Sequence, residues 1–267
     1  GANADERATC RPSEYGKVAA ALYRAVTTGA APGTGSTNVD NLIKAAAADL
    51  KKGNGLVVCQ SNDVNVQIIV NAINNAIGAN GTTIDWNATT NYKQGIDSEM
   101  VAFVNALDAG QVGAVLFHGV NPVYDYFDGA KVKSGIAKAK VSISFNDRMD
   151  ETTQACTYAV PDHHWLESWG DAEPRTGYYS FIQPTIAPLV KTRAFQDSLL
   201  TWSGPTEKYH DIYNQYWLSK LGGQGNFDKA LQDGVAEPAT PVMGSASFSG
   251  NVDEAIAKVP SAKGGKY

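Results

Sequence analysis

The sequence predicts an α/β fold, namely a three-layer αβα, doubly wound arrangement with a mainly parallel sheet and extra helices at both ends. Short β-branched runs alternate with helical segments, and Gly, Asn and Pro punctuate the connections. With 43% hydrophobic residues in 267, the chain can bury an ordinary core. We expect a helical lead-in at 1–54, the doubly wound domain at 55–205, and C-terminal helices with a loose tail at 206–267.

Two helices are expected before the sheet begins. Ser13 is a candidate N-cap for the first helix, in which Val18 and Leu22 share one face. The second helix is rich in alanine, spans residues 38–52 and is closed by Gly53, because glycine commonly follows the last turn of a helix. A flexible connection rich in glycine joins the two helices.

The sheet is expected to contain four to six strands, since each candidate is short, apolar and bounded by turn residues. The candidate strands are residues 55–60, 82–86, 113–117, 140–145 and a short fifth strand at 158–160. The intervening helices are expected at residues 63–77, 97–107 and 125–139. Strands that alternate with helices in this way are joined by right-handed crossovers.

Helices are expected again after Pro188. The helix at 207–221 carries a broad aromatic face, which we interpret as packing against its own domain because aromatic stripes at helical spacing are usually buried. The other expected helices are residues 192–202, a turn or two at 227–231, and a short docking helix at 252–259. The tail from Glu237 is expected to be loosely held.

Polar turns follow the expected strands and are expected to meet at one crevice, because ligands of open α/β sheets bind at the carboxyl ends of the strands. These turns are residues 60–62, 118–122 and 146–152, together with the loop at 162–188. The Gly-Val-Asn-Pro turn at 119–122 has two interpretations. It is a plain strand-to-helix turn, or its amides contact phosphates or a heterocycle.

The segment from Asp162 to Pro188 is expected to be an irregular surface loop, since it fits neither helical nor strand periodicity. Its aromatic content argues against disorder and favours a pocket mouth or an interface. Buried aromatic residues often anchor interfaces. The expected anchors are Trp165, Trp169, Tyr178, Tyr179 and Phe181.

Several functions are disfavoured by the sequence. The net charge of −5 and scattered lysines make nucleic acid an improbable partner, and no apolar run is long enough to cross a membrane. There is no dinucleotide-binding glycine motif after the first strand, no nucleophile elbow and no P-loop. His163, His164 and Glu167 share helical spacing but lack further ligands, so hydrogen-bonding and ion-pair roles within the loop are expected for them instead of a metal site. We assign no catalytic residue.

The three cysteines are Cys10, Cys59 and Cys156, and they are too few and too far apart to hold an iron–sulfur cluster alone. Cys59 lies in an apolar run and is expected to be a small buried residue. The roles of Cys10 and Cys156 stay open. The polar N-terminus has no export signal, and we expect the chain to be a segment of a longer polypeptide.

GVNPVYD at 119–125, KVSISFND followed by DETTQACTYAVP, and HHWLESWGDAEP with QPTIAP together resemble the molybdopterin oxidoreductase (dimethyl sulfoxide reductase) family. The resemblance implies a doubly wound domain with a crevice that either binds a pterin cofactor or is the vestige of such a site. The implied crevice residues are Asn121, Pro122, Asp147, Glu151 and Thr152. The small residue and acid of the family's A-D-x-x-L-P strand are replaced here by Thr157 and Tyr158, which implies an altered contact on the pterin side.

Residues 1–205 more specifically resemble the large molybdopterin-oxidoreductase-like iron–sulfur subunit of bacterial alternative complex III, through LESWGDAEPRTGYYSFIQPTIAPLVKTRAFQDSLLTW and GANADERATCRPSEYGKVAAALY. This implies a cofactor-free structural domain of a quinol-oxidising respiratory complex on the periplasmic face of the cytoplasmic membrane. Iron–sulfur clusters are expected only elsewhere in the parent subunit, and the partners are its other domains and subunits. The alternative is a molybdopterin guanine dinucleotide-binding domain of an active polysulfide or tetrathionate reductase.

Overall fold

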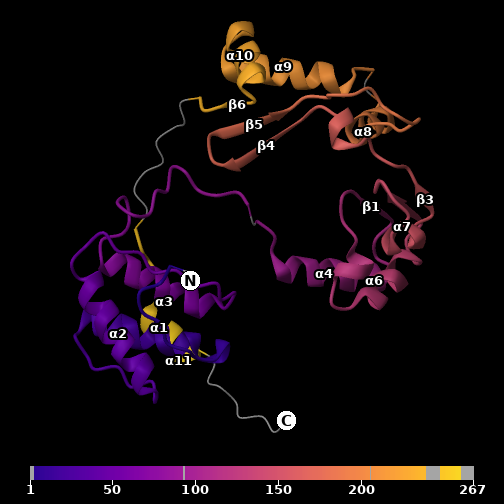
Figure 1. The fold of residues 1–267 in the computed structure, drawn as a ribbon. Coiled ribbons are helices and arrows are strands. Elements are labelled where there is room, and N and C mark those ends of the chain that lie inside the picture. Colours follow the sequence, from indigo (N-terminus) through magenta and orange to yellow (C-terminus); the bar gives the residue numbers. More distant parts are fainter. Residues whose placement is uncertain (1–2, 93, 205, 239–246, 260–267) are drawn as a thin grey trace. The chain divides into compact units, whose positions relative to one another are not determined.

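The computed structural model describes residues 3–92, 94–204, 206–238 and 247–259 and divides the chain into two compact units (Figure 1). The first unit contains Gly1–Thr89 and Pro241–Tyr267, and the second contains Thr90–Thr240. These divisions, after Thr89 and after Thr240, differ from the domain boundaries expected from the sequence, which were after residues 54 and 205. Parts of the C-terminal tail, at 239–246 and 260–267, lie outside the described residues.

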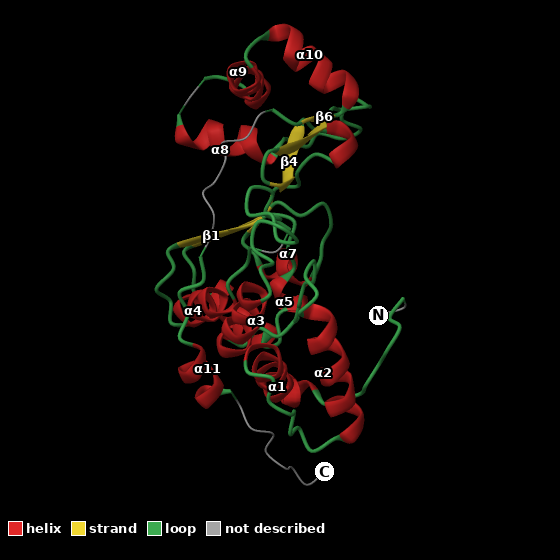
Figure 2. Ribbon diagram, turned by 90° about the vertical axis from the view of Figure 1, so that its left-hand side faces the viewer, coloured by secondary structure: helices red, strands yellow, loops and turns green. Residues whose placement is uncertain are grey.

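The first unit is built from helices (Figure 2). Its elements are the short 3-10 helix η1 (Pro12–Glu14), α1 (Tyr15–Thr27), α2 (Thr37–Leu50), α3 (Val64–Ala76) and α11 (Val252–Lys258). Helix α1 packs against both α2 and α3, and α11 packs against α3. Ile43, Ile69 and Ile73 are buried between these helices. Asp63 caps α3 by accepting hydrogen bonds from the main-chain amides of Asn65 and Val66, as expected for a helix that begins there.

Strands were expected at 55–60 and 82–86. Neither segment forms a strand in the described part of the chain, so both predictions were wrong. Residues 55–60 are not part of a ladder, because the Asn74 side chain takes the place of a strand at Val57. Its Oδ1 accepts from the Val57 amide and its Nδ2 donates to the Val57 carbonyl, each at 2.8 Å. In the other segment, Thr82, Thr83 and Ile84 donate their amides to the Ala79 carbonyl, which makes turns.

The second unit contains the parallel sheet that the sequence predicted. Its strands are β1 (Ala114–Phe117), β2 (Val141–Ser144) and β3 (Tyr158–Ala159), hydrogen-bonded in the order β1-β2-β3. Val115 and Phe117 of β1 are buried against α4 (Asp97–Asp108) and α6 (Gly129–Ile136). The mixed α/β class with a parallel sheet is therefore confirmed.

The opposite face of this sheet is open within the described part of the unit. Leu116 is 43% exposed and Val141 37% exposed, whereas their neighbours along each strand are buried. Because side chains alternate between the two faces of a strand, the helices of this unit cover one face only. Parallel sheets usually have both faces covered by helices, so this sheet differs from the usual arrangement.

The single helix expected at 125–139 is two helices, α5 (Pro122–Asp125) and α6, so that prediction was wrong in its detail. Tyr126 adopts an extended backbone and ends α5. Asp128 then caps α6 by accepting from the Lys131 amide. At Gly129 a Cβ atom would lie 2.0 Å from the Val123 carbonyl oxygen, so the junction requires glycine.

The expected irregular loop at 162–188 contains regular structure, which corrects that prediction. It holds the 3-10 helix η2 (Trp165–Glu167) and an antiparallel hairpin of β4 (Gly170–Arg175) and β5 (Tyr178–Ile182), with β6 (Val235–Ala236) added to β5. Gly177, at φ +78°, makes the turn possible. The alternation of buried Tyr179 and Phe181 with more exposed neighbours is a strand signal that the sequence analysis missed.

The remaining helices of this unit are the short α7 (Glu151–Ala155), α8 (Phe195–Ser203), α9 (Tyr209–Leu221) and α10 (Gln224–Asp233). Tyr213 and Trp217 of α9 are buried with Phe227 of α10 and the aromatic residues of β5. The Trp217 ring lies edge-on to Phe181, with a centroid distance of 4.7 Å. The interpretation of the α9 aromatic face as a core-packing face is confirmed for these two residues.

Candidate functional site

A cleft of about 530 Å³ lies at the carboxyl ends of the parallel strands. Three of the four expected polar segments line it, namely the turn after β1, the turn after β2 and the chain after β3. Residues 60–62 belong to the other unit and are not among its lining residues. Parallel strands with crossover helices bring these turns to one edge, so the sequence order alone predicts this cleft.

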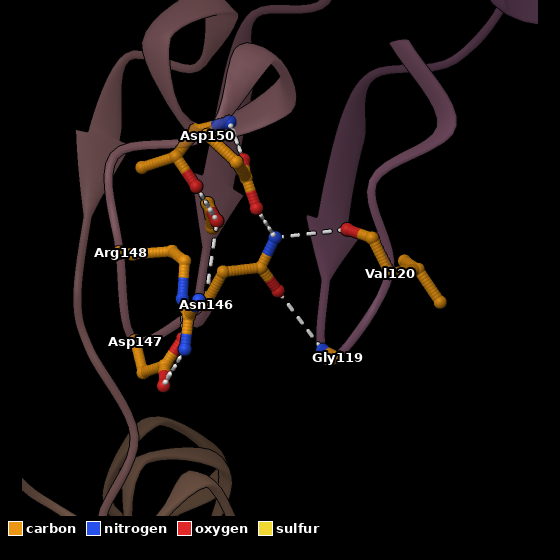
Figure 3. A network of polar contacts seen from close by, with 8 residues as sticks. Gly119, Val120, Asn146, Asp147, Arg148 and Asp150 are labelled. Atoms are coloured by element: carbon orange, nitrogen blue, oxygen red, sulfur yellow. Dashed lines mark hydrogen bonds and ion pairs between the residues drawn. The ribbon is translucent and has the colours of Figure 1, made fainter. Parts of the chain in front are cut away.

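Asn146 joins the turns that follow β1 and β2 (Figure 3). Its side-chain Oδ1 accepts from the Gly119 amide at 2.9 Å, while its Nδ2 donates to the Val120 carbonyl and to Asp150, both at 2.8 Å. Asp150 in turn caps α7 by accepting from the Thr153 amide. The Asn146 amide group is thus fully used in holding the backbone.

Asn121 is used in the same way. Its Nδ2 donates to Glu151 at 2.7 Å, and its Oδ1 accepts from both the amide and the hydroxyl of Thr152, at 3.1 and 2.7 Å. Its main-chain carbonyl accepts from the amides of Tyr124 and Asp125 at the start of α5. The hydrogen bond from Asn121 holds the pKa of Glu151 below its usual value.

The five residues implied as a pterin crevice are therefore divided. Asn121 and Asp147 line the cleft, whereas the other three do not. Pro122 is buried at the first position of α5, Thr152 is buried beneath the turn, and Glu151 is bonded to Asn121.

His118 and Asp162 form a second polar group at the cleft. His118 Nε2 lies 2.7 Å from Asp162 Oδ2, and its ring stacks on Phe195 with centroids 4.2 Å apart. The other carboxylate oxygen of Asp162 accepts the amides of His163 and Phe195. Sequence reasoning did not single out this pair, although a histidine directly after a buried strand was the available signal.

His163 and His164 line the cleft, and Glu167 follows them in η2. The Glu167 carboxylate is buried and accepts from the amides of His164 and Leu189, at 3.0 and 2.9 Å. These hydrogen bonds lower the pKa of Glu167, the one from Leu189 most. His163 instead pairs through Nδ1 with the Thr192 hydroxyl at 2.6 Å and lies 4.0 Å from Glu167. The expected structural role of these residues fits this geometry.

Carboxylates outnumber fixed cations in the cleft lining. The acidic lining residues are Asp125, Asp147, Asp150 and Asp162. Arg148 is the one arginine or lysine in that lining, and its guanidinium is bonded to Asp147 at 3.0 Å, which lowers the pKa of that aspartate. A pterin dinucleotide carries phosphates, which require N–H donors and cations. The residues present fit such an anionic group poorly.

No cluster of three or more His, Cys, Asp or Glu side chains suited to a metal ion occurs among the described residues. Within the described ranges, no helix is long and apolar enough to cross a membrane. Tyr158 is exposed on the open face of the sheet, paired in register with Ile143, and is not part of the cleft lining.

The expected interface anchors have different environments. Trp165 is 64% exposed beside the cleft, and Tyr178 is partly exposed with Arg175 over its ring. Trp169 packs between His210 and Tyr213. Tyr179 and Phe181 are buried in the aromatic core of their own unit, so they contribute to folding rather than to a free surface.

No protein-family model matches the chain, and no curated protein matches it.

Proposed function

We propose that this chain is a cofactor-free structural domain of a respiratory electron-transfer subunit, of the kind found in quinol-oxidising alternative complex III. The observation that carries the proposal is the internal bonding of Asn121. Its oxygen accepts from Thr152, and one of its two N–H groups donates to Glu151. An amide that is already paired in this way gains little by turning toward a ligand, because the buried Thr152 would lose this partner.

The charge of the cleft supports the same proposal. Four aspartates line it, and its arginine is already paired with one of them. A bound dinucleotide would bring its phosphates next to these carboxylates, and like charges at short distance in a partly buried site cost free energy. The domain would then keep the outline of a molybdopterin oxidoreductase fold without its prosthetic group. Iron–sulfur clusters would be held elsewhere in the parent subunit.

The proposal includes a three-layer, doubly wound sheet larger than the three strands described. Its support is the exposed apolar face at Leu116 and Val141. Parallel sheets normally have both faces covered. Leu116→Ser in the intact parent polypeptide tests this point. A lower melting temperature than that of the wild type is expected if further layers cover this face, and an unchanged melting temperature would contradict it.

Partners of the domain would be other parts of the same polypeptide and subunits of the membrane complex, at the periplasmic face of the cytoplasmic membrane. Trp165 supports this part of the proposal, because a large exposed aromatic residue at a cleft rim is a common interface anchor. Isolation of the complex with a Trp165→Ala subunit tests it. Reduced recovery of the other subunits is expected, and unchanged recovery would contradict the assignment.

One observation favours the alternative, a molybdopterin guanine dinucleotide-binding domain of a polysulfide or tetrathionate-type reductase. The cleft lies where cofactors of doubly wound folds bind, and its volume of about 530 Å³ is in the range of ligand sites. Metal and pterin analysis of the intact polypeptide distinguishes the two. Stoichiometric molybdenum or tungsten would favour the reductase.

A further inference from the structure

Two cysteines line one apolar cavity in the first unit. The cavity has a volume of about 690 Å³, and its walls include Cys10, Cys59, Val18 and Leu22. Both cysteines are partly buried and pack against the core shared by α1 and α3. The sequence gives no reason to pair them, since they are far apart along the chain.

Cys59 is held in place by hydrogen bonds to its backbone. The Gln67 side chain, on α3, donates to the Cys59 carbonyl at 2.9 Å and to the Ser61 carbonyl at 2.6 Å. Two residues earlier, the Asn74 amide group holds the Val57 backbone. The segment that carries Cys59 is therefore fixed along α3.

Cys10 lies next to a capped turn. The residue that follows it, Arg11, is the N-cap of η1 and donates its amide to Glu14 at 3.0 Å, and η1 leads directly into α1. Helices α1 and α3 pack against one another. The two cysteines are thus carried by segments fixed to neighbouring helices.

The electrostatics of Cys10 are consistent with this proximity. Burial raises the pKa of the Cys10 thiol, and the charges of Glu14 and Cys59 raise it further.

We propose that Cys10 and Cys59 form an intramolecular disulfide when the protein meets a small disulfide oxidant. One thiolate attacks the oxidant and forms a mixed disulfide, and the second thiolate then displaces the remaining oxidant sulfur. A sulfur–sulfur bond forms between the two cysteines and that of the oxidant breaks. Each cysteine gives up one proton and one electron, and the oxidant becomes two thiols. The inference is independent of the proposed function.

The bond would tie the N-terminal segment to residues 55–60. Cross-links that close a long loop restrict the unfolded chain and so stabilise the folded state. Cys156 serves as the internal control. It packs against the core of the other unit and is not among the residues that line the cavity shared by Cys10 and Cys59.

The test uses the whole chain, incubated with oxidised glutathione and then denatured for thiol titration. The titre is expected to fall from three thiols to one, with a Cys10–Cys59 cross-linked peptide after tryptic digestion. The three cysteines fall in separate tryptic peptides, so the linkage is read directly by mass spectrometry. Oxidation is also expected to raise the melting temperature of the wild type by several degrees.

The matched variants are Cys59→Ser and Cys156→Ser. The Cys156→Ser protein is expected to lose both remaining thiols and to keep the rise in melting temperature, whereas Cys59→Ser should show neither the internal cross-link nor that rise. Three thiols persisting in the oxidised wild type would overturn the proposal. A linkage through Cys156, or a linkage between two chains only, would overturn it as well. Peptide mapping of the wild type decides the matter even where a variant folds poorly.

Discussion

The side-chain Nδ2 of Asn121 lies 2.7 Å from Oε2 of Glu151, which joins the turn after β1 to the first residue of α7. The same asparagine is the residue that the resemblance places in a pterin crevice. Its oxygen and one of its N–H groups bond to the protein's own backbone and side chains, and this bonding supports the proposed role as a scaffold without a prosthetic group.

Asn146 is expected to stabilise the turns at the cleft. Asn146→Ala removes the bonds to Gly119, Val120 and Asp150, of which the bond to Asp150 is partly buried. We expect the free energy of unfolding to fall by about 1–3 kcal/mol, measured by chemical denaturation. Arg148→Ala is the matched control on the same turn. Its pair with Asp147 is 79% exposed at the arginine side chain, so a change within about 0.5 kcal/mol is expected. Equal losses in the two variants would contradict this role.

The crossing of α4 and α6 depends on Gly135. A Cβ atom at that position would lie 2.8 Å from Leu107 Cγ and 2.9 Å from the Asp108 amide nitrogen. Since backbone cannot move away cheaply, Gly135→Ala should destabilise the unit by about 1–3 kcal/mol. Gly225→Ala, in α10, meets no atom within 4 Å and should stabilise by up to about 1 kcal/mol. Thermal unfolding of the two variants and the wild type gives the comparison. A Gly135→Ala protein as stable as the wild type would contradict the close contact of the two helices.

Phe181 and Trp165 should behave differently although both were expected at an interface. Phe181 packs edge-on against Trp217, so Phe181→Ala should cost about 3–5 kcal/mol of stability. Trp165 is exposed, and Trp165→Ala should change the stability of the isolated chain by less than about 0.5 kcal/mol. Denaturation curves measured side by side check this. A strongly destabilised Trp165→Ala protein would show that the rim residue is a core residue.

The lowered pKa of Glu167 predicts that the free energy of unfolding depends on pH. Its folded-state pKa is lowered, chiefly by the Leu189 amide, relative to an unfolded value of about 4.3. A group with a depressed folded pKa contributes stability that is fully present above the unfolded pKa and is lost as pH falls through the folded pKa. The wild type should therefore be more stable than Glu167→Gln at neutral pH, with a difference that shrinks below about pH 4. Unfolding free energies measured from pH 7 down to pH 2 check this. A difference independent of pH would contradict the account.

The sequence predicted well those elements whose burial follows a simple period. Strands β1 and β2 and helix α3 lie within two residues of their expected limits, because short β-branched runs and an aspartate cap are local signals. The convergence of turns at the cleft followed from parallel topology.

Other features were set by contacts that no local pattern reveals. Val57 bonds to the Asn74 side chain instead of a strand, and the close approach of Gly129 to Val123 breaks one expected helix into two. The hairpin at β4 and β5 was missed because its period-2 signal is short and is interrupted by a bulge. The His118–Asp162 pair joins residues 44 positions apart, which spacing alone could not bring together.

The most direct test of the central claim is a metal and pterin analysis of the intact polypeptide purified from its native complex. The account predicts less than a tenth of an equivalent, as a rough threshold, of molybdenum, tungsten or released pterin per chain, alongside iron from the clusters expected elsewhere in the subunit. About one equivalent of molybdenum or tungsten with pterin per chain would contradict it.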